Sequence, residues 1–139
     1  MEEGSSWGSG DEKEKKKKII SALVVDDEAV VRYIHMSLLR KLNVEQVEAA
    51  ESGKAAVDAF QCGASFDLVL MDLEMPLMDG AQATKELRRM GVESKIVGVT
   101  ANGAISCEKA AFMEAGLDHC LMKPLTLENL HSLLQQFNT

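Results

Sequence analysis

The chain has 139 residues, 46% of them hydrophobic and 27% charged, which is typical of a single soluble globular domain with a substantial core. Its net charge of −7 argues against a nucleic-acid partner, which would require a basic face. The longest apolar run, residues 19–25, contains a serine and is too short for a transmembrane helix or a signal-peptide core. Cys62, Cys107 and Cys120 lack metal-ligand spacing and are odd in number, which favours reduced thiols in an intracellular protein.

Residues 1–18 are rich in Gly, Ser, Glu and Lys, and such a segment cannot bury enough apolar surface to offset its ordering entropy. We expect a disordered charged tail at 1–18, followed by one domain at 19–139. The lysines at 15–18 fit either a nuclear import signal or a solvated charge run, and we favour the latter. A cytoplasmic location is therefore expected, with a nuclear one left open.

Apolar runs and helical periodicity alternate along the rest of the chain. The expected strands cover 19–25, 45–49, 68–71, 95–99 and 118–122. The expected helices cover 28–42, 52–62, 81–90, 105–115 and the residues after Thr126. This alternation predicts an α/β fold with a doubly wound parallel sheet, in the flavodoxin-like (βα)5 arrangement with strand order 2-1-3-4-5.

The helix at 28–42 carries one apolar face, which we expect to pack on the core: Val31, Ile34, Leu38 and Leu42. Tyr33 and Met36 fall on the opposite side, as a partner patch or as ordinary scattered surface residues. His35 lies at the edge of the apolar face and is expected to be packed there.

Four of the five expected strands end in polar residues, and parallel strands end at the same edge of a sheet. The residues are Asp26, Asp27, Asp72, Thr100 and Lys123. Ligands bind beyond this edge in open parallel sheets. Clustered carboxylates raise one another's pKa values unless a counterion is present, and Mg²⁺ prefers such oxygen ligands. A phosphoryl group between metal and lysine fits this edge, with Asp72 placed to become an aspartyl phosphate.

The motifs themselves resemble the receiver domain of two-component response regulators: DD at 26–27, MDLEMPLMDG at 71–80, GVTA at 98–101 and KP at 123–124. The resemblance covers residues 19–138. It implies that Asp72 is the phospho-acceptor and that Thr100 and Lys123 hold the phosphoryl oxygens. It also implies a Mg²⁺ site formed by Asp27, by Asp26 partly through water, by Asp72 and by the backbone carbonyl of Glu74.

Longer stretches resemble the plant type-C response regulators, which consist of a receiver alone: VLMDLEMPLMDG, SKIVGVTA and AFMEAGLDHCLMKPLT. This similarity implies no DNA-binding output domain after Thr139. It implies phosphoryl transfer from a histidine-containing phosphotransfer protein, with a hybrid histidine kinase upstream, in cytokinin signalling. The expected action is that of a phosphohistidine phosphatase, or phosphate sink, by a monomer that binds neither membrane nor nucleic acid.

One position departs from the family pattern. Three residues before the lysine most receivers have Tyr or Phe, which rotates inward when the site is phosphorylated, whereas this chain has Cys120. A phosphorylation-dependent binding switch is therefore a second hypothesis. A third is a small-molecule phosphohydrolase similar to the haloacid dehalogenases, but these have an aspartate two residues after the nucleophile, where this chain has Glu74. We also expect Glu74 to affect the lifetime of the aspartyl phosphate.

Overall fold

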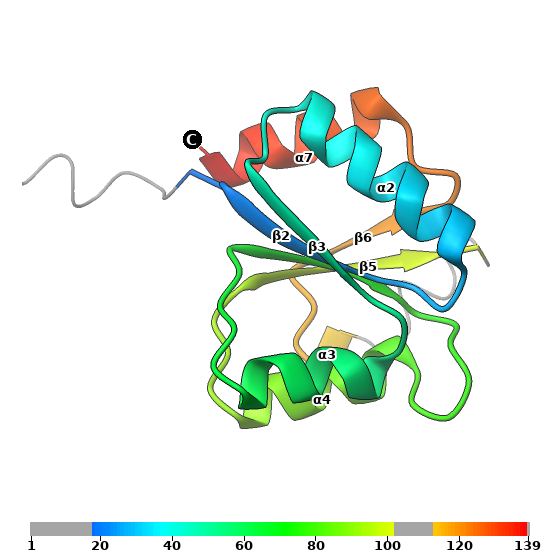
Figure 1. The fold of residues 1–139 in the computed structure, drawn as a ribbon, viewed down its shortest axis with the longest axis vertical. Helices are drawn as coiled ribbons and strands as arrows, with labels where there is room; N and C mark the ends of the chain where they lie inside the picture. Colours follow the sequence, from blue (N-terminus) through cyan, green and yellow to red (C-terminus); the bar gives the residue numbers. More distant parts are fainter. Residues whose placement is uncertain (1–17, 102–112, 139) are drawn as a thin grey trace, which may run out of the picture.

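A five-stranded parallel sheet forms the centre of the molecule (Figure 1). The structure is a computed structural model, and it describes residues 18–101 and 113–138. The strands are β2 (Ser21–Val25), β3 (Gln46–Ala50), β4 (Leu68–Asp72), β5 (Lys95–Thr100) and β6 (His119–Met122). They run in the order β3-β2-β4-β5-β6, which confirms the predicted fold class.

Helices cover both faces of this sheet (Figure 1). They are α2 (Ala29–Lys41), α3 (Gly53–Gln61), α4 (Gly80–Arg89) and α7 (Leu127–Asn138). Figure 1 shows α2 and α7 on one face, and α3 and α4 on the other. The expected helix at 105–115 lies mostly outside the described residues, as does the tail at 1–17, so neither prediction is tested.

The strands form because their apolar residues are buried on both faces of the sheet. Every residue of β2 and β4 is buried, and β5 is buried from Ile96 onward. β3 lies at the edge and is mostly exposed. Two apolar clusters result, one containing Leu23, Val69 and Leu87, the other containing Val24, Leu70 and Leu130.

Side-chain caps begin three of the helices. Ser52 accepts a hydrogen bond from the backbone of Ala55, as expected, and Thr126 accepts one from Asn129. Asp79 and Gln82 form a reciprocal capping box at the start of α4. The box holds this helix directly after the loop that follows β4.

The predicted core face of α2 is confirmed at Leu38 and Leu42, which pack against a core cluster, and is wrong at Ile34. His35 and Leu39 are the buried residues of this helix, whereas Ile34 is 46% exposed. Met36, expected at the surface, packs against the core, and Tyr33 is 70% exposed. His35 is packed, as predicted. The apolar residues of α2 therefore extend beyond the core contact and reach the surface.

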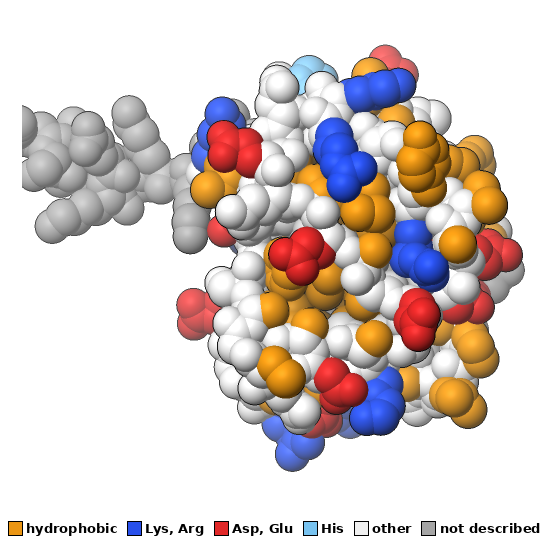
Figure 2. Space-filling view, in the orientation of Figure 1, with side chains coloured by type: hydrophobic (Ala, Val, Ile, Leu, Met, Phe, Trp, Pro, Cys, Tyr) orange, Lys and Arg blue, Asp and Glu red, His pale blue; other side chains and the backbone are white. Residues whose placement is uncertain are grey.

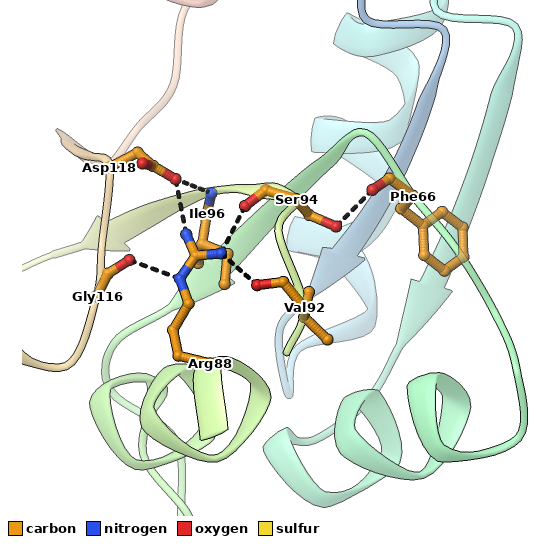
Figure 3. Close-up of polar contacts among 7 residues, drawn as sticks. All are labelled: Phe66, Arg88, Val92, Ser94, Ile96, Gly116 and Asp118. Carbon is orange, nitrogen blue, oxygen red and sulfur yellow. Dashed lines mark hydrogen bonds and ion pairs between the residues drawn. The ribbon is translucent and has the colours of Figure 1, made fainter. Parts of the chain in front are cut away.

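Arg88 ties together several segments at the amino-terminal edge of β5 (Figure 3). Its guanidinium donates to the carbonyl oxygens of Gly116, Val92 and Ser94, at 2.8 to 3.0 Å, and to the carboxylate of Asp118 at 2.8 Å. The same carboxylate oxygen accepts from the backbone N–H of Ile96 at 2.8 Å. This network fixes the segment before β6 against α4 and the start of β5.

The two cysteines in the described part of the chain differ in redox state. Cys62 is a free, exposed thiol, whereas Cys120 is disulfide-bonded. The expectation of reduced thiols is therefore wrong at Cys120.

Among the described residues, no helix has the length and apolar character needed to span a membrane.

Candidate functional site

Three carboxylates meet at the carboxyl-terminal edge of the sheet. Asp26 and Asp27 follow β2, and Asp72 is the last residue of β4, the strand beside it. One carboxylate oxygen from each of the three residues lies within 4.8 Å of the other two. Asp26 and Asp72 are only 1% and 2% exposed, whereas Asp27 is open to solvent. The structure thus brings together the acids that the sequence predicts to converge.

Lys123, one residue beyond β6, places its ammonium between the two buried acids. Its Nζ lies 2.9 Å from Asp26 Oδ2 and 3.3 Å from Asp72 Oδ1. Burial alone would favour the neutral amine, but the Asp26 and Asp72 carboxylates outweigh it and raise the pKa of Lys123. Lys123 is therefore a fixed positive charge at the site.

Burial raises the pKa of Asp72 to about 6. The Asp26 carboxylate raises this pKa as well, while the hydrogen bond from the Glu74 backbone N–H and the charge of Lys123 act against the rise. Asp72 is consequently ionised at pH 7, but it is more basic than an ordinary aspartate.

Thr100, the last residue of β5, is fully buried, and its hydroxyl donates to Glu74 Oε2 at 2.5 Å. The neighbouring backbone N–H of Ala101 donates to Glu74 Oε1 at 3.0 Å. The sequence predicts a backbone contact of Glu74 with the metal and an effect of Glu74 on the lifetime of the aspartyl phosphate, but it gives no sign of this side-chain contact. Two hydrogen-bond donors at the end of β5 thus bind an anionic group.

The loop after β4 folds back tightly against the strand. Gly80 donates its N–H to the carbonyl of Leu73 at 3.3 Å, and a Cβ at position 80 would lie 2.4 Å from the carbonyl oxygen of Asp72. Only glycine fits this close approach. At the tip of the loop, Leu77 has φ of +70° and is fully exposed. The loop therefore projects an apolar side chain into solvent.

A small apolar cavity, of about 310 Å³, adjoins the site on the side of α2. It is lined by Val31, Ile34, His35, Lys123, Pro124 and Leu125. Burial lowers the pKa of His35, so the imidazole lining this cavity is neutral at pH 7. A larger cavity, of about 700 Å³, lies near the starts of β4 and β5. Its lining includes Asp67 and Lys95 but none of the predicted site residues.

The three carboxylates fit a hard divalent cation such as Mg²⁺, which takes oxygen ligands from one or two carboxylates and water. Within the described residues, Asp26 Oδ2 is buried and accepts no well-directed hydrogen bond; its contact is the ion pair with Lys123. An oxygen of this kind is available to a cation. The exposure of Asp27 leaves the cluster open to water and ions.

This fold, with clustered acids, a hydroxyl and a lysine at the strand ends, defines a receiver. The protein-family model for the response regulator receiver domain matches residues 22–135, and the chain belongs to this family. Two-component response regulator 24 of Arabidopsis thaliana is 50% identical over 119 residues, 86% of this chain and 84% of that protein. Two-component response regulator ARR22 of the same plant is 47% identical over 122 residues, 87% of this chain and 85% of that protein. These matches confirm the resemblance to the plant receiver-only regulators.

Among solved structures, the receiver domain of the histidine kinase CKI1 from Arabidopsis thaliana, complexed with Mg²⁺ and BeF₃⁻, is similar in fold and sequence. The TM-score is 0.71 and the identity is 32%, over 84% of this chain and 88% of that one. The comparison confirms a receiver fold for this chain.

Proposed function

We propose that this chain accepts a phosphoryl group on Asp72 from the phosphohistidine of a histidine-containing phosphotransfer protein, and then releases it as inorganic phosphate. In this proposal the chain is a phosphate sink in a plant phosphorelay of the cytokinin type, fed indirectly by a hybrid histidine kinase. The similarity to plant response regulators supports the setting.

One observation carries the proposal: Asp72 Oδ1 lies 3.3 Å from Lys123 Nζ at a buried strand end, beside two further carboxylates. A nucleophile must approach a phosphoryl group that is itself anionic, so the site must neutralise charge. Lys123 supplies one fixed cation, and Thr100 and the Ala101 N–H supply neutral donors on the β5 side.

The chemistry has two steps. An oxygen of Asp72 attacks phosphorus, the P–N bond to the histidine ring breaks, and the electron pair of that bond stays on the ring nitrogen. In the second step water attacks phosphorus, the P–O bond to Asp72 breaks, and inorganic phosphate leaves the restored carboxylate. Lys123 and Thr100 would bind the equatorial oxygens in both steps.

Mg²⁺ would be held by the carboxylates of Asp26, Asp27 and Asp72 and by the backbone carbonyl of Glu74. When bound, it would supply further positive charge for the phosphoryl oxygens. Lys123 would orient the phosphoryl group, and the ion pair with Asp26 holds Lys123 in place.

The phosphotransfer protein would dock on the apolar surface beside the acids. Val30 and Ile34 of α2 are 71% and 46% exposed, and the small cavity lies between α2 and Pro124. Figure 2 shows hydrophobic side chains over the first half of α2. A helix that presents a phosphohistidine could place apolar side chains here while the ring points at Asp72. Ile34→Ser should therefore weaken donor binding, whereas Ile20→Ser, similarly exposed at the opposite edge, should not.

Cys120 favours the sink over a binding switch. It lies in β6, partly buried against one of the core clusters, where a rotating aromatic side chain would be needed for the usual coupling. The chain would then discharge its phosphoryl group without a matching change at the surface around β6.

Trapping of the acyl phosphate tests the acceptor. Borohydride reduces an aspartyl phosphate to homoserine, so a quench seconds after mixing with the phosphorylated donor should convert residue 72, as read by peptide mass spectrometry. Conversion at Asp26 or Asp27 in place of Asp72 would refute the assignment.

A further inference from the structure

The Glu74 side chain accepts hydrogen bonds from the two donors at the end of β5. Its carboxylate accepts from Thr100 Oγ1 at 2.5 Å and from the Ala101 N–H at 3.0 Å, one donor for each oxygen. Its own backbone N–H donates to Asp72 Oδ1 at 3.1 Å. The residue therefore links the acceptor carboxylate to the donors that face it.

These donors cannot serve two anions at once. Under the proposed function, on which this inference rests, Thr100 binds an oxygen of the incoming phosphoryl group. A carboxylate and a phosphoryl group repel each other, and both need the same N–H and O–H groups. The phosphoryl group must therefore displace Glu74 before it can be held in line with Asp72.

The displacement is feasible because Glu74 lies at the surface. Its residue is exposed, so its carboxylate can turn into water and regain full hydration. Asp26 and Asp72, at 1% and 2% exposure, have no such alternative. The contact of the Glu74 carboxylate with Thr100 and Ala101 can thus break and form again, unlike the buried ion pairs of Lys123.

We propose that Glu74 is a specificity-determining residue, which discriminates against small phosphodonors and favours a phosphoryl group delivered by a docked protein. A small acyl phosphate brings little more than the phosphoryl contacts with which to displace the carboxylate. A protein donor also contacts the apolar surface of α2, and the binding energy gained there offsets the displacement.

The test compares acetyl phosphate with the phosphorylated phosphotransfer protein on wild type, Glu74→Gln and Glu74→Ala. Both substitutions keep the backbone carbonyl. With acetyl phosphate, the rate of Asp72 phosphorylation should rise about tenfold for each charge-assisted hydrogen bond removed, in the order wild type, Gln, Ala. With saturating protein donor, it should change by less than about threefold, because in the docked complex Glu74 is already displaced and the substitutions then act on KM. Glu93→Gln, the same charge change at the opposite edge, should match wild type.

A second readout needs no phosphoryl transfer. Beryllofluoride with Mg²⁺ should bind Glu74→Ala about tenfold more tightly or better, followed through the NMR shift of the Ala101 amide. Equal beryllofluoride affinity, or acetyl phosphate rates unchanged or lowered in both variants, would overturn the inference. If wild type accepts nothing from the protein donor, the proposed function fails, while the beryllofluoride titration still decides the role of Glu74.

Discussion

Replacing Asp72 by Asn should stabilise the metal-free protein, and the gain should depend on pH. The pKa of Asp72 rises from its ordinary value of 3.8 to about 6, chiefly by burial. At about 1.4 kcal/mol for each tenfold change in an equilibrium constant, the ionised carboxylate costs the fold about 3 kcal/mol. The folded state binds more protons than the unfolded state between pH 3.8 and 6. The wild-type free energy of unfolding therefore falls as pH rises through this window.

Asparagine has nearly the same shape as aspartate, and its side chain does not titrate. The stability difference between Asp72→Asn and wild type should be smallest near pH 4 and about 2.4 kcal/mol larger at pH 7.5. Urea unfolding followed by far-UV circular dichroism, in EDTA from pH 4 to 7.5, measures it. Asp58→Asn is a matched control on the exposed face of α3, where its pair with Lys54 contributes little. A difference that stays constant with pH, or shrinks as pH rises, would refute the reasoning.

The remaining predictions concern residues around or opposite the site. Arg88→Lys should lower the free energy of unfolding by about 2 kcal/mol, because lysine cannot reproduce the forked contacts, and should leave phosphoryl acceptance unchanged. Gly80→Ala should cost more than about 2 kcal/mol in urea unfolding, since its Cβ would lie 2.4 Å from the Asp72 carbonyl oxygen. Burial lowers the pKa of His35, so the His35 share of the stability should decline as pH falls below 6.5, and the free energy of unfolding of wild type relative to His35→Gln should fall over the same range.

The strands and the position of the site could be predicted because both depend on simple patterns. A strand buried on two faces needs an unbroken apolar run, and β2 and β4 have one. Polar residues at the ends of parallel strands must meet at one edge, which brings Asp26, Asp72 and Lys123 together. Helix caps such as Ser52 follow from local chemistry alone.

Two features could not be predicted because they depend on tertiary contacts. The helical wheel places Ile34 on the core face of α2, but Ile34 is 46% exposed, whereas His35, predicted only at the edge of that face, and Leu39 are the buried residues of the helix. The contact of Glu74 with Thr100 depends on a side-chain rotamer and on the path of the loop after β4. Neither is encoded in the spacing of residues. The charged tail and its boundary with the domain stay predictions.

Transfer from a ³²P-labelled histidine phosphotransfer protein tests the central claim most directly. Wild type with Mg²⁺ should remove the label and release most of it as inorganic phosphate. Asp72→Asn, or wild type in EDTA, should leave the label on the donor. Removal by Asp72→Asn at the wild-type rate, or no removal by wild type, would contradict the account. Label that stays on the chain would contradict the sink and favour the binding switch.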